Sequence, residues 1–457
     1  MPLHVVILAA GQGKRMRSAL PKVLHRIAGR PLLAHVIDAA RALKPDRIHV
    51  VVGHGGDAVR AVFAGEAIEW VEQARRLGTG HALTQALPRI PRAATVLVLN
   101  GDAPLVRVEM LRKLVRAAGR GIAIATSDLS DPTGYGRVVR DAKGRVQRIV
   151  EQKDAKRAEL AIREWYAGFL AGNASRLADW LAKVANRNAQ KEYYLTDLIG
   201  IAAAAGAPVS AVKATERMEV AGVNSREELA ILERAFQNAQ AKKLLAAGVA
   251  LADLWRVDVR GDLACGQDVS IDVNCVFEGQ VKLGDGVKIG PNCVLRNVTV
   301  AAGTEVLAFS LLEDAEVGAG CRIGPYARLR PGAQLAEGVH IGNFVEVKAS
   351  RIGAGSKANH LAYIGDSEVG SRVNIGAGTI TCNYDGVAKH RTIIEDDCFI
   401  GSDATLVAPV RIAKGSYIGA GSTISRDTPP GQLTVARARQ VSIPRWAPPR
   451  KKLAGKK

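Results

Sequence analysis

Large apolar residues recur at intervals of six through most of the second half of the chain. The repeating positions fall into three runs: Ile271, Phe277, Leu283, Ile289 and Leu295; then Val317, Ile323, Leu329, Leu335, Ile341 and Val347; then Ile394, Ile400, Leu406, Ile412, Ile418 and Ile424. An α-helix repeats about every 3.6 residues and a β-strand about every 2, so neither produces this spacing. A period of six predicts a parallel β-helix, in which each hexad forms one flat face and the large residues stack into a central column.

The repeat is interrupted between Ile375 and Ile394. Residues 381–392 are polar and offer no large apolar residue for the column. An insertion into a solenoid becomes a loop on its outside, often over a binding face. We therefore expect residues 381–392 to form such a loop.

Cysteines occupy a second repeating position in the same half of the chain. Four of the six follow a large repeat residue by four places, and no two cysteines have CxxC spacing. The four are Cys275, Cys293, Cys321 and Cys398. This regular placement predicts buried small apolar side chains and argues against metal ligands or disulfides.

The first half of the chain alternates apolar runs with helical spacing. Residues 5–8 and 96–99 are continuous apolar runs, and residues 48–52 are apolar except for His49; all three are typical of buried strands. Between the first two runs, one helix face is marked by Leu33, Val36, Ile37, Ala40 and Leu43. Strands separated by helices predict an α/β domain with a doubly wound parallel sheet.

A helix is expected to join the two halves. Ser225 and Glu228 form a capping-box pattern, and Gly248 is a plausible end for the helix. The apolar stripe between them consists of Leu229, Leu232, Phe236 and Ala239. We therefore divide the 457 residues into a first domain of residues 1–226, a linker helix of residues 227–247 and a β-helix domain of residues 248–457.

The formal net charge of +19 favours an acidic partner. Aromatic residues make up only 4% of the chain and are not interleaved with a basic run, which argues against a nucleic-acid-binding surface. The basic tail of residues 445–457 is expected to be solvated. No apolar run is long enough to span a membrane and no signal peptide begins the chain, so we expect a cytoplasmic protein that binds small anionic substrates.

A glycine loop follows the first predicted strand. Gly11 and Gly13 come directly after the strand, and Met16 stands where a dinucleotide-binding loop would have a third glycine. Backbone amides of such a loop can cradle phosphate, and Arg15 and Lys22 add positive charge on either side of it. The pattern predicts a phosphate-binding loop that is not of the dinucleotide type.

Asp102 follows the predicted strand of residues 96–99. Ligands of doubly wound sheets bind at the carboxyl ends of the strands. A lone carboxylate in this place suits a hard cation such as Mg²⁺, held jointly with substrate phosphates.

Several short motifs occur in the order typical of one family. They are residues 8–16, 20–24, 77–81, 131–137, 151–154 and 192–197, together with Gln73. Over essentially the whole chain this order resembles the bifunctional bacterial N-acetylglucosamine-1-phosphate uridylyltransferase / glucosamine-1-phosphate N-acetyltransferase family. The resemblance implies an N-terminal uridylyltransferase domain and a left-handed parallel β-helix acetyltransferase domain.

The resemblance implies a UTP and UDP-sugar site in the first domain. Its members would be Leu8, Ala9, Ala10, Gly11, Arg15, Lys22, Gln73, Gly78, Thr79, Asn100, Gly101, Asp102, Gly136, Glu151, Tyr166 and Asn224. Gln73, Gly78 and Thr79 would contact the uracil and ribose, and Gly136 and Glu151 the amino sugar. Asp102 and Asn224 would hold Mg²⁺.

Three motifs of that family are changed in this chain. The family's Tyr-Gly-Asp is Asn100-Gly101-Asp102, its Asn-Thr-Gly is Tyr166-Ala167-Gly168, and Lys191 stands for the glycine of its Gln-Gly-Glu-Tyr-Tyr. The family asparagine helps to hold the sugar, and Tyr166 is far bulkier. A pocket that loses a sugar partner loses discrimination, so we expect a weakened or altered uridylyltransferase. A monofunctional acetyltransferase with an impaired N-terminal domain is the alternative.

The resemblance implies a second site in the β-helix. Arg330, Lys348, Tyr363, Asn374, Asn383 and Tyr384 would bind the sugar phosphate, and Ala377, Ser402, Ala420 and Arg437 would bind acetyl-CoA. His360 would be the general base, because an amine that attacks a thioester must lose a proton and imidazole titrates near the working pH. The backbone amide of Ala377 would stabilise the anionic tetrahedral intermediate.

These expectations combine into the synthesis of UDP-N-acetylglucosamine from glucosamine-1-phosphate, acetyl-CoA and UTP. The resemblance also implies a homotrimer with acetyltransfer sites between neighbouring subunits. A regulatory nucleotide-sugar sensor is a non-enzymatic alternative, and the retained His360 with its surrounding constellation argues against it. A nucleic-acid-binding module lacks any matching motif.

Overall fold

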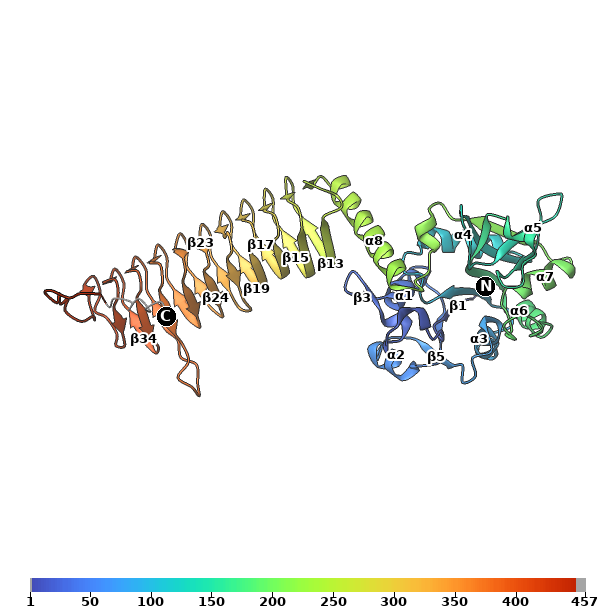
Figure 1. Cartoon of the computed structure of the whole chain (residues 1–457), viewed down its shortest axis with the longest axis horizontal. Coiled ribbons are helices and arrows are strands. Elements are labelled where there is room, and N and C mark those ends of the chain that lie inside the picture. Colours follow the sequence, from blue (N-terminus) through green and yellow to red (C-terminus); the bar gives the residue numbers. More distant parts are fainter. Residues whose placement is uncertain (1, 449–457) are drawn as a thin grey trace, which may run out of the picture. The chain divides into compact units, whose positions relative to one another are not determined.

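The computed structural model describes residues 2–448 and separates the chain into two compact units, Met1–Lys242 and Lys243–Lys457 (Figure 1). The described residues contain no helix that is both long enough and apolar enough to cross a membrane. The last nine residues of the basic tail lie outside the described range.

A mixed β-sheet forms the centre of the first unit. Its strands, in spatial order, are β11 (Val209–Lys213), β7 (Ile122–Asp128), β10 (Glu164–Asn173), β6 (Thr95–Asn100), β1 (Leu3–Leu8), β4 (Arg47–Val52) and β5 (Glu69–Glu72). The three predicted strands are β1, β4 and β6, and their apolar residues are buried. Along this order the sheet is parallel except at β10, which runs antiparallel to β6 and β7 and also pairs with the antiparallel hairpin of β8 (Arg137–Arg140) and β9 (Val146–Val150). β10 comes after this hairpin in the chain. A strand parallel to its neighbours needs a long crossover connection, and the chain makes none between β9 and β10.

Helices cover both faces of this sheet. One face packs against α1 (Leu32–Arg41), α2 (Gly56–Val62) and α4 (Val108–Ala118), and the other against α3 (Thr79–Ala86), α6 (Ala174–Leu181) and α7 (Asp197–Ala204). The remaining short elements are β2 (Arg26–Ile27), β3 (Arg30–Pro31), α5 (Arg157–Leu160) and the 3₁₀ turns Lys14–Met16, Lys22–Leu24, Leu87–Arg89 and Arg217–Val220. Two helical layers around a mostly parallel sheet confirm the predicted doubly wound α/β fold.

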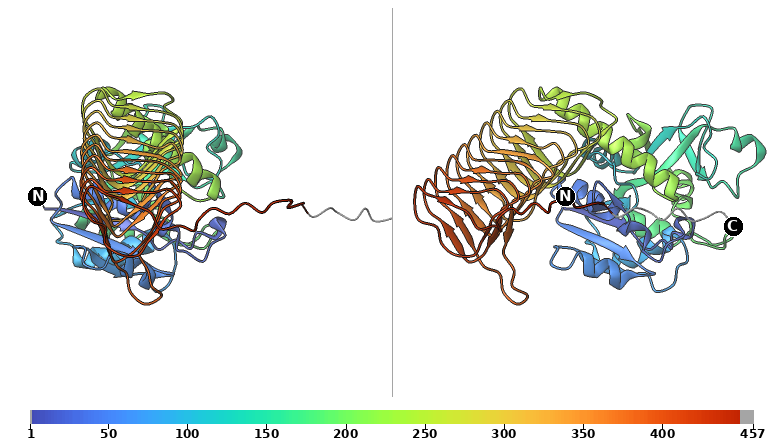
Figure 2. Two further views of the ribbon diagram at one scale, coloured as in Figure 1. Left: turned by 90° about the vertical axis from the view of Figure 1, so that its left-hand side faces the viewer. Right: turned by 60° about the vertical axis from the view of Figure 1, so that its left-hand side comes forward.

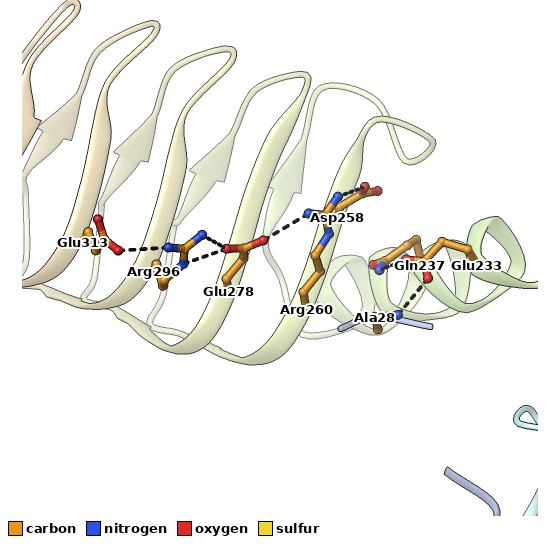
Figure 3. A network of polar contacts seen from close by, with 8 residues as sticks. All are labelled: Ala28, Glu233, Gln237, Asp258, Arg260, Glu278, Arg296 and Glu313. Atoms are coloured by element: carbon orange, nitrogen blue, oxygen red, sulfur yellow. Dashed lines mark hydrogen bonds and ion pairs between the residues drawn. The ribbon is translucent and has the colours of Figure 1, made fainter. Parts of the chain in front are cut away.

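The predicted joining helix is α8 (Arg226–Ala246). Its capping box is complete, because the Ser225 hydroxyl accepts from the Glu228 amide at 3.1 Å and the Glu228 carboxylate accepts from the Ser225 amide at 3.0 Å. Glu233 of α8 also accepts from the Ala28 amide at 2.7 Å and from the Gln237 side chain at 2.8 Å (Figure 3). Gly248 lies just past the helix with φ +92°, the left-handed conformation that ends many helices.

The second unit is the predicted parallel β-helix, whose stacked coils are plain in Figures 1 and 2. One sheet consists of β12 (Ala250–Leu251), β14 (Ser270–Ile271), β16 (Lys288–Ile289), β18 (Glu305–Val306), β20 (Arg322–Ile323), β23 (His340–Asn343), β26 (Lys357–His360), β29 (Asn374–Ile375), β32 (Phe399–Ile400), β35 (Tyr417–Ile418) and β37 (Leu433–Thr434). The large repeat residues, together with the four predicted cysteines, lie in one continuous buried core.

The other faces belong to a second sheet. Its early strands β13 (Val257–Cys265), β15 (Cys275–Leu283), β17 (Val294–Val300) and β19 (Leu311–Val317) are long. After β19 the sheet divides into one row of β21 (Arg328–Leu329), β24 (Glu346–Lys348), β27 (Tyr363–Gly365), β30 (Ile380–Cys382), β33 (Thr405–Val407) and β36 (Thr423–Ile424), and another of β22 (Gln334–Leu335), β25 (Arg351–Ile352), β28 (Ser367–Val369), β31 (Thr392–Ile394) and β34 (Val410–Ile412).

The predicted loop is shorter than the sequence indicates. Thr381 is 2% exposed in β30 and pairs with Leu406, so it occupies the column position that the pattern left empty. A threonine fills this place because its hydroxyl reaches the Tyr363 and Gly365 carbonyls at 3.4 and 3.2 Å. The excursion therefore comprises residues 383–391, which leave the body of the helix (Figure 1).

Charges of alternating sign line one register of the early coils. Arg260, Glu278, Arg296 and Glu313 pair in order along β13, β15, β17 and β19. Arg296 lies between two carboxylates, with contacts of 2.5 Å to Glu278 and 2.9 Å to Glu313 (Figure 3). Because parallel strands place equivalent residues side by side, Glu278 and Arg296 in the middle of the row each meet two charges of opposite sign.

One corner of the coils carries stacked aromatic rings. Phe309, Tyr326 and Phe344 have φ near +60° and ring centroids 5.0 and 5.2 Å apart. All three are about half exposed. A left-handed backbone conformation is rare for bulky residues, and solvent exposure is unfavourable for aromatic rings. Three aromatic residues with both properties at one corner are therefore unusual.

Two histidines are buried together in the first unit. His4 of β1 and His49 of β4 have ring nitrogens 3.0 Å apart, and Nδ1 of His49 lies 3.2 Å from Glu69 of β5. Burial lowers the pKa of both imidazoles, that of His49 to about 4.

Candidate active sites

The carboxyl ends of β1 and β6 open into a cavity of about 820 Å³ in the first unit. The predicted nucleotide residues that line it are Leu8, Ala9, Ala10, Gly11, Lys22, Gln73, Gly78, Thr79, Asn100 and Asp102. Gly13 has φ +60° where the chain turns from β1 into the first 3₁₀ segment. This is the place and the loop geometry expected for bound phosphates in a doubly wound fold.

Gln73 and Gly78 are held in one small network. The buried Gln73 side chain donates to the Gly78 carbonyl at 3.0 Å. Gly78 has φ +108°, and a Cβ there would lie 2.6 Å from the Tyr193 carbonyl oxygen. Only glycine fits this close approach, so the backbone at the cavity wall is fixed by packing against the chain near Tyr193.

Three polar side chains converge beside the glycine loop. The Lys22 ammonium group donates to the Asp102 carboxylate and lies 3.3 Å from Oδ1 of Asn224. Asn224 comes from the chain just before α8, and its backbone amide donates to Glu228 at 2.6 Å. Two oxygens that share one cation in this way also suit a divalent metal.

The described residues contain no cluster of three or more His, Cys, Asp or Glu side chains that could hold a metal alone. Asp102 and Asn224 supply only two oxygen ligands, so substrate phosphates and water would complete the shell of a bound ion. This fits the Mg²⁺ pattern of a few protein ligands combined with substrate phosphates.

A second cavity of about 250 Å³ shares Leu8, Thr79, Asn100 and Asp102 with the first. The other predicted residues that line it are Arg15, Gly136, Glu151, Tyr166 and Asn224. Gly101 lies between two lining residues but lines neither cavity.

The polar groups of the second cavity are mostly buried. Glu151 accepts from the Thr196 hydroxyl at 2.9 Å, and burial raises the pKa of its carboxyl. The Tyr166 hydroxyl is buried and has no hydrogen-bond partner within the described residues. Gly136 packs closely against Ile149, because a Cβ at this position would lie 2.8 Å from Cγ2 of that side chain, and Glu151 lies next to it.

In the β-helix, the predicted sugar-phosphate residues other than Asn374 lie on or beside the row of β21, β24, β27 and β30. Arg330 and Lys348 continue the register of the charge row, and Arg330 donates to Glu346 at 2.8 Å. The hydrogen bond that Arg330 donates to Glu346 raises the pKa of Arg330. The alternation of charge ends here, since Gly365 follows Lys348 in register. An ammonium group without a carboxylate neighbour in its row is suited to a phosphate.

Asn383 and Tyr363 lie beside this cation. The Asn383 amide donates to Asp366 and approaches the Tyr363 hydroxyl at 3.4 Å. Tyr384 and Asn374 are partly exposed, Tyr384 at the start of the 383–391 loop and Asn374 in the other sheet. The loop is ordered by Asp385, which accepts from the Ala388 amide at 2.7 Å. That bond and the His390 side chain hold the pKa of Asp385 well below its ordinary value.

The predicted acetyl-CoA residues form a column of their own. Ala377, Ser402 and Ala420 each lie two places after a stacked residue of the first sheet. The same column begins with Asn343 and His360 in the two coils before them. Arg437 closes the column by donating to the Ala420 carbonyl at 2.7 Å. His360 is exposed, and its Nδ1 lies 2.8 Å from Oδ1 of Asn343. Since that oxygen can only accept, Nδ1 carries the proton and Nε2 is free to act as a base.

The two groups of β-helix residues lie on different sheets of the same subunit. Lys348 and Arg330 belong to the row of β21 and β24, whereas His360 belongs to β26 of the other sheet. Within residues 2–448, no hydrogen bond or ion pair connects them.

Sequence reasoning missed several residues of these sites. They are Asn343, Glu346, Asp366, Lys389, Thr196, Arg75 and Arg76. Lys389 of the 383–391 loop lies near Lys348, and contact with that ammonium group lowers the pKa of Lys389. The hexapeptide register could have found Asn343, because it precedes His360 by one coil in the same column. Nothing in the local sequence marks Lys389.

Known families and relatives match both units. Residues 5–166 match the MobA-like NTP transferase domain, residues 259–352 the GMPPB C-terminal domain, and residues 391–426 six bacterial transferase hexapeptide repeats. A protein of Bordetella parapertussis named bifunctional protein GlmU is 59% identical over 455 residues, which cover 98% of this chain and 100% of that protein. Its namesakes in Aromatoleum aromaticum and Chromobacterium violaceum are each 58% identical, over 99% and 98% of this chain.

Proposed function

Because the chain belongs to the family of bifunctional GlmU proteins, we propose that its two units catalyse the two successive steps that make UDP-N-acetylglucosamine. The β-helix transfers an acetyl group from acetyl-CoA to glucosamine-1-phosphate. The first unit then couples the product to UTP and releases pyrophosphate. The observation that carries this proposal is the match to bifunctional relatives over nearly the whole of both chains. The hexapeptide repeats also identify the β-helix as left-handed.

The acetyltransfer step follows from the His360 column. The sugar amine attacks the thioester carbon while Nε2 of His360 takes its proton, and the C–S bond breaks as the C–N bond forms. Asn343 holds the imidazole in the tautomer that leaves Nε2 free. Ala377, Ser402 and Ala420 offer small side chains, which leave space for the coenzyme along the coils. Lys348 and Arg330 bind the phosphate of the acceptor.

The uridylyltransfer step needs positioning and charge neutralisation and no covalent nucleophile. The sugar phosphate attacks the α-phosphorus of UTP in line, and pyrophosphate leaves. Lys22, Arg15 and the loop amides bind the phosphates, while Gln73 and Gly78 hold the uracil and ribose. Glu151 and Gly136 bind the amino sugar in the smaller cavity.

The nucleotidyltransferase family implies a divalent metal ion, and we infer that Mg²⁺ is the ion used here. Asp102 and Asn224 would hold it, since both oxygens already share one cation. When bound, such an ion neutralises charge on the phosphates of UTP.

We infer that the protein is a homotrimer whose acetyltransfer sites lie between neighbouring subunits. Three observations support this. All the sugar-phosphate residues except Asn374 lie outside the sheet that carries the His360 column of one subunit. The 383–391 loop leaves the body of the helix (Figure 1) and exposes Tyr384 and Val387, which a neighbour can contact. Exposed stacked aromatics at Phe309, Tyr326 and Phe344 offer apolar surface for such contacts.

Two assays on the purified chain test the proposal. Thiol release from acetyl-CoA with glucosamine-1-phosphate reports the first step, and pyrophosphate release from UTP with N-acetylglucosamine-1-phosphate reports the second. We expect both activities. Acetyltransfer without pyrophosphate release would favour the monofunctional alternative, which the match to bifunctional relatives does not support.

A further inference from the structure

Tyr166 brings a polar group without a partner into the smaller cavity of the first unit. Its side chain is 8% exposed, and its hydroxyl has no hydrogen bond among residues 2–448. The ring packs with the apolar core between the sheet and α3, α6 and α7, while the residue lines the cavity beside Glu151 and Thr196. A buried hydroxyl without a partner is unfavourable unless a ligand completes its hydrogen bonds.

Asn100 brings a second unpaired polar group to the same cavity. It ends β6 directly across from Gly168 of β10, as the antiparallel register of these strands requires. A Cβ at Gly168 would collide with the Asn100 amide nitrogen, so glycine at this position is what allows the carboxamide to lie there. The Asn100 side chain forms no hydrogen bond within the described part of the chain, and it lines both cavities.

The two residues are also the positions where the chain departs from the family's motifs in a reciprocal way. The family has an aromatic residue at position 100 and a carboxamide at position 166, and this chain has the reverse. Both positions lie on neighbouring strands and line one cavity. The cavity therefore still contains one tyrosine and one asparagine, but the asparagine now comes from β6 and the tyrosine from β10.

We propose that Tyr166 and Asn100 together form the sugar-recognition pair of the uridylyltransferase site, with the buried hydroxyl and the free carboxamide as hydrogen-bond partners of the N-acetylglucosamine ring. The proposal rests on the proposed function and concerns which residues select the sugar. It replaces the expectation of a weakened pocket by that of a rearranged one.

Tyr166→Phe tests the pair, because it removes the unpartnered hydroxyl and keeps the ring. We expect kcat/KM for N-acetylglucosamine-1-phosphate to fall about 10- to 100-fold. The KM for UTP, the acetyltransfer rate and the melting temperature should not fall. An unchanged kcat/KM for the sugar phosphate would overturn the proposal for Tyr166.

Tyr194→Phe is the matched control. The Tyr194 hydroxyl is also buried, but it already accepts from Gln190 at 2.9 Å and lines neither cavity. Its loss should lower stability and leave discrimination between sugars unchanged. A structural role for Tyr166 would produce that same result in Tyr166→Phe and would count against the proposal.

Deoxy analogues identify the contact. We compare the 3-deoxy, 4-deoxy and 6-deoxy forms of N-acetylglucosamine-1-phosphate. With the native enzyme, one of them should have a kcat/KM reduced by the same factor as Tyr166→Phe reduces kcat/KM for the full substrate. That analogue should lose nothing further with the variant, since both changes remove one bond. If the loss of kcat/KM for every analogue, including glucosamine-1-phosphate without its acetyl group, simply added to the loss from Tyr166→Phe, a direct contact would be overturned.

The exchange itself tests Asn100. Asn100→Tyr and Tyr166→Asn should each lower kcat/KM for the sugar phosphate at least about tenfold, and the double exchange should recover at least about tenfold over the worse single variant. Strictly additive losses would show that the two residues do not act as a pair. Failure of the proposed function looks different, because the native chain would then release no pyrophosphate at all.

Discussion

The Lys22 ammonium group forms an ion pair with the Asp102 carboxylate, which follows it by 80 positions in the sequence. Lys22 comes from the loop after β1 and Asp102 from the end of β6, so the pair depends on the parallel adjacency of these strands. The lysine thereby places a positive charge on the two oxygens inferred to hold Mg²⁺. It also lies next to the amides expected to bind phosphate.

Asp102→Asn should raise the Mg²⁺ concentration for half-maximal pyrophosphate release at least about tenfold, because it removes the anionic ligand and keeps the shape of the side chain. A magnesium titration of uridylyltransfer measures this. Acetyltransfer on the same preparation serves as the control. An unchanged titration midpoint would mean that Asp102 is not a ligand of the ion.

Lys22→Met should lower kcat/KM for UTP about 10- to 100-fold, the usual range for losing a hydrogen bond to a charged group. It should also tighten binding of Mn²⁺ measured without nucleotide, since the competing ammonium group is gone. Weaker Mn²⁺ binding would show that the lysine supports the metal ligands and does not compete with the ion.

His360→Ala should slow acetyltransfer by roughly 10²- to 10⁴-fold and leave pyrophosphate release unchanged. Asn343→Ala should slow it less, by roughly tenfold, because the imidazole remains and only its tautomer is released. His340→Gln, three residues before Asn343 in the coil that precedes His360, is the control and should change neither rate. Equal losses of both activities in His360→Ala would indicate a structural role.

The sequence predicted most of the architecture because its two periods are physically distinct. The six-residue spacing identified the buried column from Ile271 to Ile424, and the runs of Val, Ile and Leu identified β1, β4 and β6. It placed Thr381 in the loop, because threonine is polar and the pattern requires an apolar residue. In the structure Thr381 is buried in the column, where backbone carbonyls accept from its hydroxyl. The pattern also missed the reversed direction of β10, which depends on a hairpin and leaves no periodic signal.

Site residues on repeated or motif positions were predictable, and those that depend on tertiary proximity were not. His360 and Ser402 occupy positions that the repeat fixes, so each can be located from its own coil. Lys389 approaches Lys348 only because the 383–391 loop folds back through Asp385. Tyr166 was expected to harm the sugar pocket, and only the structure shows that Asn100 lines the same cavity.

Light scattering should give a mass about three times that of one chain, with acetyltransfer activity that depends on assembly. Phe344→Asp should favour smaller species, because it places a charge among stacked exposed rings, and acetyltransfer should fall with the trimer fraction. Trp255→Asp, also at an exposed aromatic but in an earlier coil that carries none of the three stacked rings, is the control. A monomer with full acetyltransferase activity would contradict the assembly.

Folding stability should fall as the pH decreases from about 6.5 to about 4. His49 stays neutral in the folded state down to about pH 4, whereas the unfolded chain takes up the proton near its ordinary pKa of 6.5. The lowered pKa therefore costs roughly 2 kcal/mol in the free energy of unfolding between pH 7.5 and pH 5. Unfolding titrations of the native chain and of His49→Gln measure it, and the difference between the two pH values should shrink in the variant. An equal pH dependence in both would locate the effect elsewhere.

Arg296→Ala should lower the free energy of unfolding of the β-helix by about 1 kcal/mol at low salt, because it removes two adjacent contacts of the charge row. The loss should shrink in concentrated NaCl, which screens exposed charges. Lys288→Ala, which removes a single exposed pair with Glu305, is the control and should change stability by less. A salt-independent loss would point to packing by the arginine stem.

The register of the coils gives the acetyltransferase site an unusual kind of modularity. In the early coils, equivalent residues are separated by 17 or 18 positions, as between Ile271, Ile289 and Val306. Deleting one whole coil before Tyr326 would shorten the solenoid and keep every later side chain on its own face. Deleting a single hexad between Asn343 and His360 would turn all later residues by one face, which would remove His360 from the column of Asn343. Evolution can therefore lengthen or shorten this protein in coil-sized steps without redesigning its chemistry, and hexad-sized steps are closed to it.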